Sequence, residues 1–469
     1  MCISDSIAPA GSYPPAFRIL TSSENVGHIL RVIEHLSETS HLHSVSIMSL
    51  QGKASHLPPE LWTRILEYAT YVPGLYDVDV LDPFNCPNSQ TPDDSFLKTD
   101  LASALKTKLS LPLVCRRWYA FAMPLLYRCI VVGSKQGLHA VIDTLMASKQ
   151  RTTTQSDPSS SLGCCTHLVT IAVDDRVYSQ DLRVEPLVQL IQCLPNLKIL
   201  LISILHRSRR IGEPLPDHVM KALFETCGPS LQKVHFRKAI PSRQQSGVLT
   251  LCAPHLRTVI YGNEESYISF EDYCPVNLPR APNLSFMTLT TRRSCHIIHD
   301  YHEHFPSVKQ ALFRTSRFLP SIDSWMHFLT MQGPLLTTVY LDLIGPRAAS
   351  YVQPFMDALE IRCPHLIHLV IYLTDCWDLS PWSSISVTHL GVHCSQQDPI
   401  TTANYPQLFT SILNLHAPAL KVVRLLNPDS RSIQLMLRSP PQNTDAIHRR
   451  SRTLQFEDHE GKTLSLTSQ

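Results

Sequence analysis

An apolar pattern that returns ten times after residue 160 is the feature that most constrains the fold of this 469-residue chain. Each copy has the form Leu-x-x-Leu-x-Leu, with other apolar residues in place of some leucines, and successive copies begin 21 to 34 residues apart. The leading residues are Leu168, Leu197, Leu231, Leu256, Leu284, Val308, Leu336, Leu366, Val387 and Leu420. A segment this short cannot bury its own apolar side chains, so neighbouring copies must stack and share one core.

Each repeat combines the signals of a helix, a helix stop and a strand. Most leading residues are preceded, two positions earlier, by a proline, and proline ends helices. The last two apolar positions are two residues apart, which is the period of a strand with one buried face. Helix-like apolar segments come before several prolines, for example at 219–224 and 355–361. The alternative that this pattern leaves open is an ordinary layered α/β domain.

This arrangement resembles an irregular leucine-rich-repeat solenoid, an α/β fold of parallel strands with helices, and we assign it to residues 164–428. The asparagine or cysteine that usually follows the strand in this family is absent, so the repeats are divergent. In the expected register, the residue between the last two apolar positions and the residue just after them point to the concave face. A mixed set of aromatic and basic side chains there suits a protein-binding surface. The candidate substrate-binding residues are Arg237, Arg314, Tyr340, Tyr372, His393 and Arg424.

Two short blocks before the repeats predict a pair of helices. The first is Leu-Pro-Pro-Glu-Leu-Trp at 57–62, where the prolines suit a first helical turn and Glu60 lies near the positive helix end. Apolar residues then recur at helical spacing, and Pro73 with Gly74 ends the run. The second block is Leu-Val-Cys-Arg-Arg-Trp at 113–118.

Together the two blocks resemble an F-box, the helical module that docks on the Skp adaptor of cullin–RING ubiquitin ligases. The match covers residues 53–132 and is interrupted by an insertion at about 70–110, as in some fungal F-box proteins. The resemblance implies that a set of residues contacts the adaptor or builds the F-box core: Leu57, Pro58, Ile65, Leu66, Val114, Cys115 and Trp118. The alternative is a helical hairpin that caps the solenoid and binds no adaptor.

Composition argues against several other classes of protein. The net charge of +2 gives no bulk attraction to nucleic acid or to anionic membranes. The sequence has neither a signal-peptide pattern at its start nor an apolar run of membrane-spanning length. Its 14 cysteines are scattered without a Cys-x-x-Cys pair, which indicates free thiols in a reducing compartment, cytoplasmic or nuclear.

The sequence carries no catalytic signature that we can assign. Phosphate-binding glycine loops, the Gly-x-Ser-x-Gly nucleophile pattern and the His-Glu-x-x-His pattern are all missing from it. On a helix Cys295, His299 and Glu303 would share one face at metal-ligand spacing, but the sequence offers no obvious second ligand pair. We therefore expect a non-enzymatic protein without metal or cofactor.

These observations predict a substrate-recognition subunit of a Skp–cullin–F-box ubiquitin ligase, with an unknown protein substrate on the repeats. Residues 1–52 form an N-terminal segment that could be repeat-like, 133–163 a helix and linker, and 429–469 a polar tail. The alternative function is a leucine-rich interaction scaffold that is not linked to ubiquitin. The substrate and the role of the insertion are not readable from the sequence.

Overall fold

The computed structural model describes seventeen stretches of the chain. They are residues 58–85, 97–133, 135–153, 161–174, 184–205, 217–236, 252, 254–261, 280–290, 305–314, 323–343, 349–373, 387–394, 411–413, 415, 417–426 and 454–464. Arg237, Leu57, the cluster at 295–304 and residues 1–52 lie outside the described residues.

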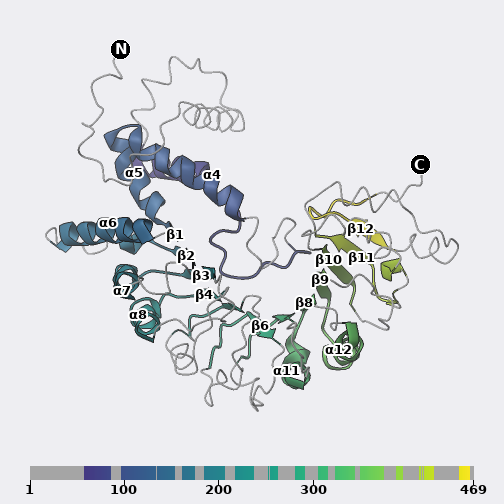
Figure 1. The fold of residues 1–469 in the computed structure, drawn as a ribbon. Helices are drawn as coiled ribbons and strands as arrows, with labels where there is room; N and C mark the ends of the chain where they lie inside the picture. The colour runs from purple at the N-terminus through teal and green to yellow at the C-terminus, as the bar shows by residue number, and fades with distance from the viewer. Residues whose placement is uncertain are drawn as a thin grey trace, which may run out of the picture. The chain divides into compact units, whose positions relative to one another are not determined.

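Within the described residues, twelve strands form one sheet whose order follows the chain (Figure 1). The strands pair in parallel from β1 to β2 and from β4 through β12, which confirms the expected α/β fold of parallel strands and helices. The strands are β1 Cys129–Val132, β2 Leu168–Asp174, β3 Ile199–Leu205, β4 Lys233–Phe236, β5 Thr258–Tyr261, β6 Phe286–Thr290, β7 Gln310–Arg314, β8 Thr338–Leu343, β9 His368–Leu373, β10 His389–Cys394, β11 Val422–Leu425 and β12 Gln455–Glu457. All ten predicted repeats supply a strand, β2 to β11, at the predicted positions.

The helices precede the strands in many of the repeats. The α-helices are α3 Pro59–Ala69, α4 Leu97–Ser110, α5 Arg116–Tyr127, α6 Lys135–Thr153, α7 Val184–Gln192, α8 Asp217–Cys227, α11 Asp323–Gln332 and α12 Ala349–Arg362. Short 3-10 turns are η3 Leu111–Leu113, η5 Leu162–Cys165 and η8 Gly333–Leu335. None of the described helices combines the length and apolar character needed to cross a membrane.

The prolines at the fixed offset sit in the turn that joins helix to strand. The backbone N–H of Leu336 donates to the carbonyl of Gly333 over 3.1 Å, and that of Leu366 donates to Cys363 over 3.1 Å. Pro334 and Pro364 therefore occupy the second position of each turn, where the fixed φ of proline is already correct. A proline at this point both ends the helix and sets the direction of the strand.

The chain divides into two compact units. The first unit comprises residues 1–76 and 93–200, and the second comprises residues 77–92 and 201–469. The backbone thus leaves the first unit at Tyr76, returns to it at Asp93 and leaves it again after Leu200. The predicted insertion is therefore divided: residues 77–92 belong to the second unit, and the parts before and after them, including α4, belong to the first.

The helical part of the first unit packs around a small apolar core. Leu66 of α3 and Leu111 of η3 are fully buried with Ala122 and Leu125 of α5, and Trp118 packs against them. The indole rings of Trp62 and Trp118 lie 5.4 Å apart. Both predicted F-box blocks therefore contribute helices to the same core.

Aromatic side chains fill the space between strands and helices in the second unit. Phe313 of β7 contacts Trp325 and Phe328 of α11 and Phe355 of α12, with ring centroids 4.9 to 5.9 Å apart. Figure 1 shows α11 and α12 on one side of β8 and β9. This side of the sheet holds the apolar positions that define the repeat.

Three expected boundaries differ from the structure. Residues 148–153, expected in a linker, continue α6, because Lys, Gln and Arg are good helix formers and Ser148 is buried. Within the expected F-box range, β1 pairs with β2, and within the expected polar tail, β12 pairs with β11 and buries Phe456. A strand of three or four residues is too short for its period to stand out in the sequence.

Candidate functional site: a sheet face covered by a strap

One face of the sheet in the second unit is covered by residues 77–85, which we call the strap. The strap consists of turns and bends and forms neither helix nor strand. It covers the side of the sheet opposite α11 and α12, because successive strand residues point to opposite faces: Phe313 packs on the helices, whereas Leu312 packs in the cluster that contains Val80 of the strap. We call this side the strap face.

A central row of side chains crosses the strap face. Strand register aligns one residue from each of seven neighbouring strands, namely Thr288, Leu312, Tyr340, Val370, Gly391, Arg424 and Glu457. The first six are positions that the sequence predicted to lie on the concave face, whereas Glu457 of β12 lies outside the ten predicted repeats. Val80 packs into the apolar part of this row and is itself buried.

The first half of the strap is held by polar contacts at the starts of β4 to β6. Lys233 donates from Nζ to the carbonyl of Asp77 over 3.1 Å. The carboxylate of Asp79 pairs with the guanidinium of Arg257 over 2.6 Å and accepts a hydrogen bond from Ser285 over 3.1 Å. Because the Asp79 and Arg257 side chains are both partly exposed, solvent weakens this ion pair.

Asp82 makes the most buried polar contacts of the strap. One carboxylate oxygen accepts a hydrogen bond from Oγ1 of Thr338 over 2.6 Å and lies 2.5 Å from Nδ1 of His368. The other oxygen accepts from the backbone N–H of Phe84 over 2.9 Å, which closes a tight turn. Burial alone would raise the pKa of Asp82, but the hydrogen bonds from His368, Thr338 and Phe84 outweigh it and lower the pKa below its usual value. The carboxylate is therefore held in its charged form.

Phe84, near the end of the strap, packs against two histidine rings and one guanidinium group. Its ring centroid lies 4.8 Å from that of His368 and 5.2 Å from that of His389, and the guanidinium of Arg424 lies 5.1 Å from it. Gly391 lies beside the ring: a Cβ at that position would be in ordinary contact with Phe84 at 3.5 Å, and it would crowd Leu426 at 3.1 Å and Val370 at 3.3 Å. Arg424 also donates to the carbonyl of Pro83, so backbone and ring are both recognised.

Two buried ion pairs lie farther along the strap face. Arg424 donates to Glu457 of β12 over 2.5 and 2.8 Å, and Arg314 of β7 donates to Asp342 of β8 over 2.7 Å. In each pair the carboxylate lies against the buried guanidinium, so neither charge is left isolated. Burial, together with Asp82 and Tyr372, raises the pKa of Tyr340 well above its usual value.

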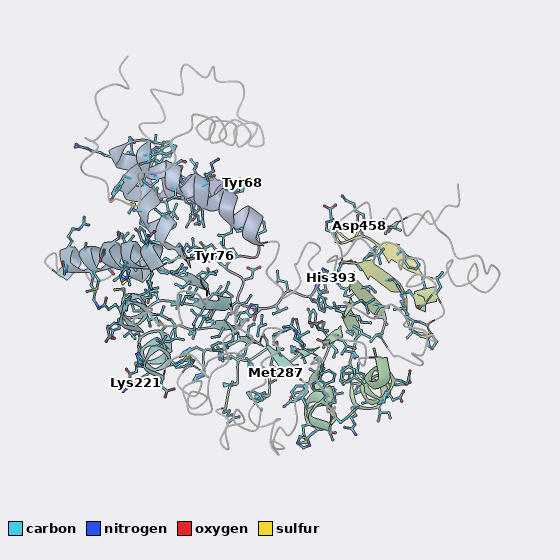
Figure 2. All side chains as sticks on the ribbon, viewed as in Figure 1. Tyr68, Tyr76, Lys221, Met287, His393 and Asp458 are labelled. Carbon is cyan, nitrogen blue, oxygen red and sulfur yellow. The ribbon has the colours of Figure 1, made fainter. Side chains whose placement is uncertain are left out.

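Five of the six predicted substrate-binding residues are described, and the structure places them on the strap face. Arg314, Tyr340 and Arg424 are buried, while Tyr372 and His393 are half-buried with ring centroids 5.5 Å apart. His393 is labelled in Figure 2. Their contact with a substrate stays a prediction.

The sequence did not predict the contacts between the strap and the sheet. Asp79, Asp82 and Phe84 lie in the insertion at about 70–110, to which the sequence assigned no role. His368 and His389 start β9 and β10, two residues before the central row, so strand alternation could have placed them on this face. No local pattern links either histidine to an aspartate nearly 300 residues earlier.

The predicted adaptor-binding residues divide into exposed and buried groups. Pro58 and Val114 are exposed, Ile65, Cys115 and Trp118 are half-buried, and Leu66 is fully buried. Cys115 caps α5, because its sulfur accepts the backbone N–H of Trp118 over 3.5 Å. The half-buried and buried residues build the hairpin core, and the exposed ones are available for contact.

Three further apolar side chains on or next to α3 are exposed. Leu61 is 45% exposed, Tyr68 64% and Tyr71 63%, and Tyr68 is labelled in Figure 2. Exposed apolar side chains in a group mark contact surfaces more often than isolated ones do. None of these three is among the residues that the F-box resemblance implies for adaptor contact.

Tyr76 fixes the point where the strap begins. Lys108 donates to its hydroxyl over 3.4 Å, and the guanidinium of Arg128 lies 4.8 Å from its ring centroid. Arg128 is held in turn by Glu67 of α3 over 3.0 Å. The residue before the strap is thus anchored among the helices of the first unit (Figure 2).

Comparison with known proteins finds similarity only to solved structures, and it is distant. No family model matches the chain, and no curated protein does. A solved structure that aligns with it is the leucine-rich repeat-containing protein LegL7 from Legionella pneumophila. That alignment has 12% identity and a TM-score of 0.26, and it covers 72% of this chain and 85% of that one.

Proposed function

We propose that this chain is a substrate-recognition subunit of a Skp–cullin–F-box ubiquitin ligase, with the repeats as its protein-binding part. The observation that carries the proposal is the hairpin of α3 and α5. Both F-box-like blocks meet in one core around Leu66 and Trp118, and Pro58 and Val114 stay exposed beside it. That division of buried and exposed residues is the one that adaptor docking requires.

In this proposal the chain performs no chemistry itself. A Skp-type adaptor would bind the hairpin and link it to a cullin, and the repeats would hold the target protein. Ubiquitin transfer would then depend on proximity, because the complex brings a target lysine close to a thioester carried by another subunit. Metal ions and cofactors have no part in the proposed role.

One observation favours the second candidate, a leucine-rich scaffold whose hairpin is a cap. Helix α5 leads directly into β1, and the segment between them is hydrogen-bonded to the next repeat: Thr166 donates to the carbonyl of Tyr127 over 2.9 Å, and His167 to that of Arg128 over 3.0 Å. A hairpin built onto the first strand in this way also covers the end of the core, which terminal repeats need.

Co-purification with a Skp adaptor separates the two candidates. We expect the wild-type chain to bind and Pro58→Asp to abolish binding while the chain stays folded, because Pro58 is exposed. The matched control is Met146→Asp, which places the same charge on an exposed apolar residue of α6 in the same unit and should leave binding unchanged. A folded wild-type chain that binds no adaptor would favour the cap.

A further inference from the structure

The sheet contacts the strap through the kinds of interaction by which proteins bind peptides: ion pairs, hydrogen bonds to backbone carbonyls, and apolar and aromatic packing. Four side chains of the strap each lie in a different environment. Asp79 pairs with Arg257, and Val80 packs against the apolar part of the central row. Asp82 contacts Thr338 and His368, and Phe84 packs against two histidine rings and the guanidinium of Arg424. The carbonyls of Asp77 and Pro83 accept hydrogen bonds from Lys233 and Arg424. Charged, apolar and aromatic contacts therefore alternate along the strap.

The strap face carries a clear charge preference. The groups that hold the strap are Lys233, Arg257, His368 and Arg424, and the strap presents aspartates to two of them. Glu457 and Asp342 also lie on this face, but each is already paired with an arginine. An acidic ligand is therefore favoured over a basic one.

The fit between strap and sheet is incomplete at β5 and β6. The hydroxyls of Thr258 and Thr288 are buried without a hydrogen-bond partner among the described residues. Thr258 pairs in register with Phe286, which packs with Val80, and Thr288 belongs to the central row. A buried hydroxyl that lacks a partner destabilises the structure, so a ligand with a polar group near Val80 would match this part of the face better than the strap does.

We propose that the strap face is a binding site for an acidic peptide of a protein partner, and that the strap is an internal occupant which this peptide replaces. The peptide has the order acidic, apolar, any residue, acidic, any residue, aromatic, as in the strap from Asp79 to Phe84. The proposal takes from the proposed function only that the repeats bind proteins.

The strap occupies the strap face more readily than a free peptide of the same sequence would, because it is part of the same chain. It is tethered at Tyr76, so its effective concentration is in the millimolar range of short linkers. Weakening the strap without changing the sheet should therefore raise the affinity of the chain for a peptide added in solution. Asp82→Asn does this, since it keeps the size of the side chain and removes the charge that His368 and Thr338 contact.

The experiment measures binding of a fluorescently labelled synthetic peptide of residues 77–85 to the full chain by anisotropy. We expect roughly tenfold to a hundredfold tighter binding to the Asp82→Asn chain than to wild type, the range set by loss of hydrogen bonds to a charged group. The matched control is Glu225→Gln, an exposed acidic residue of α8 in the same unit, which should bind the peptide as wild type does. A peptide carrying Phe84→Ala should bind more weakly to every chain.

The proposal is overturned if the Asp82→Asn chain keeps the wild-type thermal transition and circular dichroism yet binds the peptide no better. If that variant does not fold, hydrogen exchange of the wild-type chain decides. Excess peptide should accelerate exchange of the strap amides, and unchanged exchange would make the strap a permanent part of the core. Adaptor binding is measured on the same samples, so a chain that binds peptide but no adaptor contradicts only the proposed function.

Discussion

Burial changes the chemistry of particular side chains at the residue scale. Burial is the main reason that the pKa of His167 falls to about 4, and Lys198 and Arg128 add to it. The thiols of Cys227, Cys252 and Cys363 are also buried, which raises the pKa of each to about 12 and leaves them mostly as unreactive thiols. Among the described cysteines, most are buried, as a chain of free thiols was expected to show.

His167 makes stability depend on pH. Between pH 6.5 and 4 the unfolded chain binds a proton at this residue and the folded chain does not, so stability falls as the pH falls through this window. We expect His167→Gln to reduce the loss of melting temperature between pH 7 and 4, measured by circular dichroism. The exposed His139 of α6 provides the control, and an equal effect of His139→Gln would contradict the assignment.

At the element scale, burial changes sharply at the point where a strand begins. Leu369 of β9 is fully buried, whereas Ile367, two residues earlier, is 44% exposed just before the strand begins. Gly333 lies in the turn before β8, where a Cβ would come within 2.5 Å of the carbonyl oxygen of Arg362. A strand thus requires an apolar residue at a buried position, and a turn requires a glycine where backbone segments come close together.

Leu369→Ala should destabilise the chain by about 2–5 kcal/mol, the cost of a cavity at a fully buried leucine. Ile367→Ala removes a similar volume from a partly exposed site and should cost much less. Urea unfolding of the two variants measures the difference. Similar losses would mean that the register of β9 is wrong.

Gly333→Ala should cost about 1–3 kcal/mol, because the added methyl group meets backbone that cannot rotate away. Gly133 supplies the matched control, since a Cβ there has no heavy atom within 4 Å. Gly133→Ala should leave stability unchanged or raise it by up to about 1 kcal/mol. Chemical denaturation compares them, and a neutral Gly333→Ala would show that the turn can shift.

The path of the chain between the two units is the main feature at the scale of the whole molecule. The backbone leaves the helical hairpin after Tyr76, covers the strap face and returns to the first unit at Asp93. Residues 77–92, the middle part of the insertion that interrupts the F-box pattern, therefore belong to the second unit. The strap shields Tyr340 and the apolar row around it from solvent.

Replacing residues 77–85 with a Gly/Ser segment of equal length should expose this row. The pKa of Tyr340 lies well above its usual value because the residue is buried beside Asp82, and both causes are removed by the replacement. We expect one more tyrosine to titrate near pH 10, as measured by tyrosinate absorbance. The same replacement combined with Tyr340→Phe should lose that added signal; if it does not, another tyrosine is responsible.

The sequence by itself determined the repeat, the strand positions and the proline turns. All of these are local: a period of two reports one buried face, and a proline at a fixed offset reports where each helix ends. The residues of the hairpin core could also be predicted, because Leu66 and Trp118 lie in or next to short blocks with strong helix signals. These features depend on neighbours within a few residues, so their pattern survives in a single sequence.

Only the tertiary structure decided what covers the strap face. Asp82 meets Thr338 and His368 across 256 and 286 residues of sequence, and Pro83 meets Arg424 across 341. A strand shows in its own period that a face is present, but the segment that packs on that face is selected by complementary charge, shape and hydrogen bonding. Those complements come from distant parts of the chain, so no local pattern could pair them.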